Sequence, residues 1–96
     1  MNVVFKSELL ADLYQGIQQG KPTYTQEEVR QFIKLINMIR ASPTIADLGK
    51  IKSCRLHKLS NGYLSLSTNM KGRVVFLHFK IDNSAFIEEF SKNHYE

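Results

Sequence analysis

Residues 48–81 form a cationic stretch that also carries two histidines and a tyrosine. Of the 13 basic residues in the chain seven lie here, which leaves six against all nine acidic residues elsewhere. The formal charge of +4 is therefore concentrated in the middle of the chain. Most residues of the stretch alternate between apolar and polar, as strands do. A cationic sheet with histidines suits a protein that holds and acts on a polyanion.

His57 is the candidate for proton transfer. RNA cleavage without a metal uses the ribose 2′-oxygen as nucleophile, and histidine suits the removal of its proton because the ordinary histidine pKa is near neutrality. His57 is expected to point outward on a strand, beside cations. An ordinary exposed histidine is the alternative. His78 alternates with apolar residues and is expected to be packed with a hydrogen-bond partner.

Arg55, Lys58 and Tyr63 are candidates for contact with RNA. Arginine and lysine bind phosphate, although both residues equally fit solvated strand positions. Tyr63 can stack on a base or simply cover the end of a hairpin. No metal or cofactor site is expected, since one cysteine and three scattered histidines lack ligand spacing and there is no phosphate-binding glycine loop. Cys54 falls on the inward alternation, which predicts a small core residue.

The start of the chain predicts a strand and a helix. Residues 2–5 are mostly apolar and include two β-branched valines, which favours a strand. Ser7 predicts a helix cap, and apolar residues at helical spacing follow it as far as Ile17. Glycines and a proline then predict a connection over 18–24.

The second predicted helix has the clearest signals. Thr25 and Glu28 predict a capping box, in which each side chain satisfies a backbone donor of the first turn. An apolar stripe at three- and four-residue steps predicts an amphipathic helix over 26–41. Pro43 ends it, because proline disfavours helical conformation in the preceding residue. One further helical turn is expected at 44–48.

The second half of the chain predicts an antiparallel meander. An Asn-Gly pair at 61–62 predicts a tight hairpin turn. The last segment fits helix or strand, and we favour strand because the preceding hairpins leave an edge to pair. Strands are expected at 54–59, 63–68, 73–81 and 85–91. The elements predict an α+β domain with two helices on one face of an antiparallel sheet of four to five strands, and a polar face opposite.

Length and composition favour one domain over 1–96. The pI near 9.3 favours an anionic partner, and nucleic acid before membrane, because there is no basic amphipathic helix with a wide apolar face. No apolar run approaches the ~18 residues of a transmembrane helix, and no signal-peptide pattern is present. One cysteine allows no internal disulfide. A cytoplasmic protein is expected.

Several segments in order resemble the HigB-type toxins of the RelE-like toxin–antitoxin superfamily. The resemblance covers essentially the whole chain and depends on the order and spacing of its segments. These are Phe-Lys-Ser-Glu-Leu-Leu-Ala-Asp-Leu-Tyr from residue 5, Ser-Pro-Thr-Ile-Ala-Asp-Leu from residue 42, Arg-Leu-His at 55–57, Gly-Arg-Val-Val-Phe at 72–76, and His94.

The resemblance implies a RelE-like fold and the toxin of a type II module, a metal-independent, ribosome-dependent endoribonuclease that cuts mRNA. It implies a cognate antitoxin of helix-turn-helix type as partner. It assigns proton transfer to His57 and His94 and the scissile phosphate to Arg73. Arg55 and Lys58 would assist, and Tyr95 joins Tyr63 as a stacking candidate.

Two departures from the family pattern favour a rival function. Ser60 stands where a lysine often follows the strand histidine, and Asn93 stands where a tyrosine often precedes the terminal histidine. The rival is a catalytically silent relative that acts by binding, either as a gyrase poison or as a generic nucleic-acid binder. A generic binder predicts affinity for naked nucleic acid that falls steeply with salt.

Overall fold

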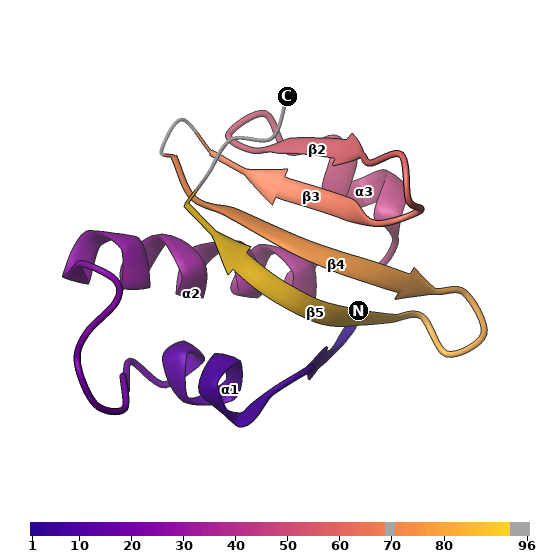
Figure 1. Cartoon of the computed structure of the whole chain (residues 1–96). Helices are drawn as coiled ribbons and strands as arrows, with labels where there is room; N and C mark the ends of the chain where they lie inside the picture. The colour runs from indigo at the N-terminus through magenta and orange to yellow at the C-terminus, as the bar shows by residue number, and fades with distance from the viewer. Residues whose placement is uncertain (69–70, 93–96) are drawn as a thin grey trace.

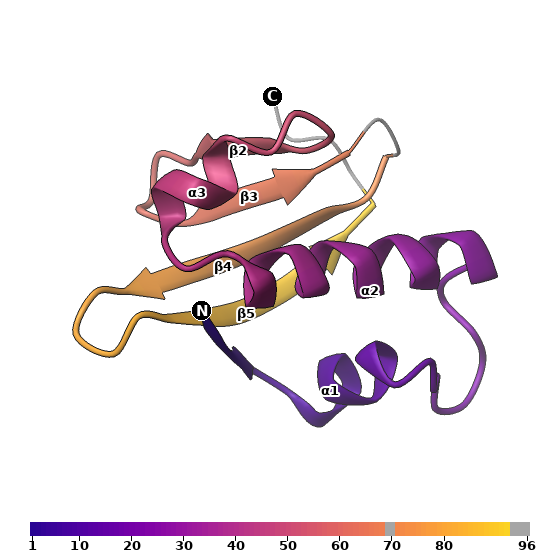
Figure 2. The same cartoon turned by 180° about the vertical axis from the view of Figure 1, so that it is seen from behind.

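The chain forms two layers, a five-stranded sheet and a set of helices that cover one of its faces (Figures 1 and 2). The computed structural model describes residues 1–68 and 71–92. The elements in chain order are β1 (Asn2–Phe5), α1 (Glu8–Tyr14), α2 (Gln26–Ala41), α3 (Ile45–Gly49), β2 (Arg55–Lys58), β3 (Leu64–Ser67), β4 (Arg73–Phe79) and β5 (Ser84–Ser91). The α+β class and the four predicted strands of the second half are confirmed, each boundary within two residues.

The sheet is mixed, and the prediction of a wholly antiparallel sheet was wrong. Its strand order is β1-β5-β4-β3-β2. Three successive hairpin pairings are antiparallel, but β1 pairs parallel with β5, with Val3 opposite Ala85 and Phe5 opposite Ile87. The helices between β1 and the meander bring the chain back so that β1 and β5 run in the same direction. Residue alternation carries no information about strand direction, and so could not reveal this.

α2 begins and ends where the local signals predicted. The Thr25 hydroxyl accepts a hydrogen bond from the Glu28 amide at 3.1 Å, and the Glu28 carboxylate accepts one from the Thr25 amide at 2.7 Å. Ser42 caps the other end in extended conformation, as expected for a residue before proline. α3 is the predicted extra turn after Pro43, and it adds a third helix to the two expected.

α1 is shorter than the apolar spacing predicted. Ser7 caps it as expected, but the helix ends at Tyr14 and Ile17 lies beyond it, 53% exposed. Gly16 has φ +80, a conformation that takes the chain out of the helix and is easy only for glycine. The amide of Ile17 then donates back to the Asp12 carbonyl at 2.9 Å. The helical spacing of apolar residues therefore continues about one turn beyond the end of the helix.

The core lies between α2 and the helix-covered face of the sheet. Phe32 of α2 contacts Phe90 of β5 with ring centroids 5.1 Å apart, and both are almost fully buried. Cys54 belongs to this core as predicted, and burial raises the pKa of its thiol. The other fully buried large side chains are Phe76, Leu35, Ile36, Ile39, Leu48, Leu66, Ile87 and Val74.

Gly72, just before β4, allows a close approach of the sheet to α2. A Cβ atom at this position would lie 2.5 Å from Cζ of Phe90 and 2.6 Å from Oε1 of Gln31. The Gln31 amide also donates to the Gly72 carbonyl at 2.8 Å. The backbone here therefore has no room for a side chain.

We expect Gly72→Ala to destabilise the protein by about 1–3 kcal/mol, the usual range for overpacking a core. The measurement is urea unfolding. Gly49→Ala is the matched control, because its added Cβ would meet the nearest atom, of Leu56, at an ordinary 3.6 Å. Equal stability of the two variants would contradict the close approach.

Candidate nucleic-acid interface

The helices cover one face of the sheet and leave the opposite face open (Figure 1). The predicted site residues Arg55, His57 and Arg73 of β2 and β4 lie on that open face. On β2, Leu56 packs against the core, so by alternation its neighbours Arg55 and His57 lie on the opposite face. On β4, Val74 is in the core, which places Arg73 on that same open face. The structure thus brings these three predicted residues together on one surface.

The strand register arranges the open face into two neighbouring rows. Arg55 and Arg73 stand in one row and His57 in the next. With strands about 4.8 Å apart and residues about 3.3 Å apart along a strand, the Cα atoms of His57 and Arg73 are separated by roughly 12 Å. One phosphodiester group between the two side chains can therefore approach both. The first row consists of Arg55, Ser67, Arg73 and Ser91, and the second row consists of His57, Ser65, Val75 and Glu89.

The open face is partly closed at its centre. Ser65 alternates with the core residues Leu64 and Leu66 and so points to the open face, yet it is 2% exposed, and Val75 beside it is 6% exposed. Ser65 is a small residue on an inner strand, and its register neighbours are His57 on β2 and Val75 on β4. Ser65 therefore contributes almost nothing to the polar surface, which is formed by the residues around it.

A hollow of about 750 Å³ opens on this face beside the rows. Tyr63 is half-buried in its wall, and Val75 also lines it. Lys58 also borders the hollow. Its register partner Leu64 belongs to the core, but Lys58 is the last residue of β2 and its side chain is exposed. The hollow is lined by Lys6, Lys58, Leu59, Ser60, Asn61, Tyr63, Val75, Glu88 and Glu89.

Two glutamates of β5 enter this surface, and the sequence interpretation missed them. Glu89 stands opposite Val75 in the register, and Glu88 is the extra residue of a bulge between the pairs that join β4 and β5. Lys6 donates to Glu88 at 2.6 Å, and this hydrogen bond with its charge attraction raises the pKa of Lys6. The surface is therefore mixed in charge, although residues 48–81 contain no acid. The sequence did contain a signal for this acidic contribution. Glu88 and Glu89 are adjacent in a predicted strand, and alternation requires one of two adjacent strand residues to face the open side of the sheet.

His78 is packed, as its apolar neighbours predicted. Its Nε2 lies 2.9 Å from Oδ1 of Asn83, whose amide nitrogen donates to the Pro43 carbonyl at 2.6 Å. In the register it stands opposite Ala85, a core residue, and so faces away from the His57 row. Its role is to fasten the β4–β5 turn to the segment after α2.

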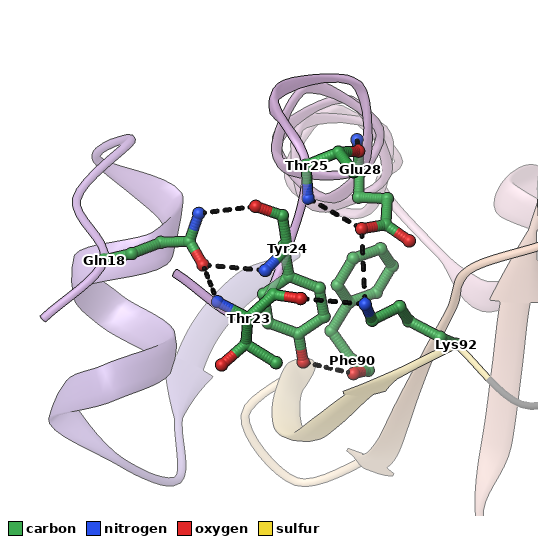
Figure 3. A network of polar contacts seen from close by, with 7 residues as sticks. All are labelled: Gln18, Thr23, Tyr24, Thr25, Glu28, Phe90 and Lys92. Carbon is green, nitrogen blue, oxygen red and sulfur yellow. Dashed lines mark hydrogen bonds and ion pairs between the residues drawn. The ribbon is translucent and has the colours of Figure 1, made fainter. Parts of the chain in front are cut away.

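His94 and Tyr95 lie outside the described residues, so only the chain just before them can be placed. Lys92 is held by three groups, which Figure 3 shows together. Its ammonium donates to the Thr23 carbonyl at 2.8 Å, lies 3.5 Å from the Glu28 carboxylate, and stands 5.3 Å from the centre of the Tyr24 ring. The end of the described chain is thereby attached to the start of α2.

The same network continues into the connection between α1 and α2 (Figure 3). The Tyr24 hydroxyl donates to the Phe90 carbonyl at 2.7 Å, which ties this connection to β5. Gln18 accepts from the amides of Thr23 and Tyr24 and donates to the Tyr24 carbonyl. The segment leading to His94 is thus fixed at Phe90 and again at Lys92.

Within residues 1–68 and 71–92, no group of three or more His, Cys, Asp or Glu side chains is placed to hold a metal ion. None of the helices in these ranges has the length and apolar character needed to cross a membrane. The fold is that of an α+β domain with a mixed five-stranded sheet. No family model matches the chain, and no curated protein matches it.

Glu28 allows a test of the network through pH. The hydrogen bond from the Thr25 amide, supported by Lys92, lowers the pKa of Glu28 below its ordinary 4.5. A carboxyl group whose pKa is lower in the folded than in the unfolded protein stabilises the fold at pH values above its unfolded-state pKa. This stabilisation is lost as the pH falls through the folded-state pKa. We expect Glu28→Gln to lower the melting temperature at pH 7 by a few degrees, and the difference from the parent to shrink below about pH 4.

Thermal melts followed by circular dichroism between pH 3 and pH 7 make this measurement. Glu27→Gln is the control, because Glu27 is an exposed acid of the same helical turn. A difference between Glu28→Gln and the parent that stays constant with pH would show that the charge of Glu28 plays no part.

Proposed function

We propose that this protein is a metal-independent endoribonuclease that cuts mRNA on the ribosome, the toxin of a type II toxin–antitoxin module with a RelE-like fold. The observation that carries the proposal is the placement of Arg55, His57 and Arg73 in neighbouring rows of one open sheet face. The order of the HigB-like segments in the sequence supports the same class.

The proposed chemistry divides between these side chains. His57 accepts the proton of the ribose 2′-hydroxyl as the 2′-oxygen attacks the adjacent phosphorus. Arg73 holds the phosphate oxygens with the fork of its guanidinium and stabilises the added charge of the transition state. His94 donates a proton to the departing 5′-oxygen. The products are a 2′,3′-cyclic phosphate on one fragment and a 5′-hydroxyl on the other.

Arg55 and Lys58 contribute charge around the reacting phosphate. Arg55 shares the row of Arg73, so it suits the neighbouring phosphate of the same strand. The ribosome would supply the orientation of the message that the protein alone does not impose. The proposed partners are therefore the ribosome with its mRNA and a cognate antitoxin, in the cytoplasm.

Expression of variants in bacteria tests the proposal. We expect His57→Ala and Arg73→Ala to relieve growth arrest and to lower cleavage by about 10²–10³-fold, the usual loss when one transition-state contact is removed. Primer extension on cellular mRNA measures cleavage directly, because each cut creates a new 5′ end.

Arg30→Ala is the matched control, since Arg30 is an exposed arginine of α2, in the helical layer and away from the open face. It should keep full toxicity and full cleavage. Full toxicity of the Arg73→Ala variant, with new 5′ ends unchanged, would remove Arg73 from the mechanism.

A catalytically silent binder is the second candidate. The observation in its favour is that, within residues 1–68 and 71–92, His57 is the one histidine on the open face, since His78 faces the other way. A gyrase poison or generic nucleic-acid binder arrests growth without creating 5′ ends in mRNA. Primer extension after induction therefore separates the two functions.

A further inference from the structure

The hollow beside the His57 row has the composition of a nucleobase pocket. Its described lining includes one aromatic ring, Tyr63, and an apolar side chain, Val75. Lys6 and Lys58 provide cations, and Glu88 and Glu89 provide carboxylates. Its volume of about 750 Å³ is ample for a nucleotide. An aromatic ring beside cations is the usual way in which proteins bind an unpaired base and its phosphate.

The two carboxylates differ in their availability. Glu88 already accepts the hydrogen bond from Lys6 at 2.6 Å. Glu89 is exposed, and within the described part of the chain its carboxylate forms no hydrogen bond and no salt bridge. An ionised carboxylate only accepts hydrogen bonds. Glu89 therefore favours a base edge that presents donors and disfavours one that presents acceptors.

Guanine is the base whose edge matches a single carboxylate. Its N1–H and its exocyclic 2-amino group are neighbouring donors that point in the same direction, so each can donate to one carboxylate oxygen. Adenine and cytosine present one amino group beside an acceptor nitrogen, and uracil places its one N–H between two carbonyl oxygens. With each of these bases the carboxylate would face at least one acceptor.

We propose that this hollow binds a guanine base of single-stranded RNA, stacked on Tyr63 and read by Glu89, with Lys58 near its phosphate. The proposal rests on the function proposed above and gives that site a base preference. Because the hollow adjoins the His57 row, a guanine held there places its backbone close to the residues proposed to cut. Glu89 is a specificity residue in this arrangement and takes no part in proton transfer.

Binding of an RNA that cannot be cut tests the pocket apart from cleavage. The probe is a fluorescein-labelled hexauridine with 2′-O-methyl riboses throughout and one central position varied. Guanosine at that position is compared with inosine, which lacks the 2-amino group, and with adenosine. We expect guanosine to bind about tenfold more tightly than either, as a bidentate contact typically discriminates.

Two variants assign the preference to its residues. Glu89→Gln is expected to remove the guanosine preference, because the amide replaces one acceptor with a donor. Tyr63→Leu is expected to weaken all three probes together, since stacking is insensitive to base identity. Glu27→Gln, which removes the same charge from an exposed site on α2, should leave both the affinity and the preference unchanged.

Equal binding of the guanosine and inosine probes, or a preference that survives Glu89→Gln, would overturn the pocket proposal. In that case new 5′ ends in cellular mRNA would still support the nuclease. A guanosine preference lost in Glu89→Gln supports the pocket even where no mRNA is cut, and the protein is then a guanine-selective binder. The two proposals therefore fail separately.

Discussion

The structure depends on the burial of the apolar stripe of α2 against one face of the sheet. Phe32, Leu35, Ile36 and Ile39 are fully buried there, and the sheet contributes Leu66, Val74, Phe76 and Ile87 to the same core. Burial of this kind is the dominant favourable term in folding, and it commits one sheet face to the interior. The opposite face is thereby left available to polar side chains. Arg55, His57 and Arg73 owe their positions to that division, because strand alternation then decides which side chains reach the open face.

Pairing between strands, and not closeness in sequence, sets the chemistry of the open face. Arg55 and Arg73 are separated by 18 positions, yet both pair with Ser67 and so share a row. The same register brings Glu89 beside Val75, which places a carboxylate next to a surface that the local sequence would make purely cationic. A mixed surface of this kind repels a polyanion at some points and attracts it at others. If the proposed RNA ligand binds here, such a surface would select among positions along the strand as well as attract it.

Features with a local physical cause were predictable from the sequence. The capping box of Thr25 and Glu28, the stop at Pro43, the strand character of 85–91 and the packed state of His78 all follow from contacts within a few residues or from alternation. The parallel pairing of β1 with β5 was not predictable, because strand direction is decided by how two intervening helices return the chain. The end of α1 at Tyr14 and the burial of Ser65 do not follow from local sequence patterns either. A left-handed residue at Gly16 overrode helical spacing, and strand neighbours covered an otherwise polar position.

The pairing of β1 with β5 also has a consequence for biosynthesis. β1 can find its place in the sheet only when β5 has left the ribosome, since Asn2 pairs with Ser84 and Phe5 with Ile87. Contacts between such distant segments form late and slow the completion of the fold. Until then the chain can form α2 and the hairpins, but not the finished sheet. Completion of the sheet therefore waits for the synthesis of β5, and a partner that recognises the paired β1 and β5 would meet only chains that already include β5.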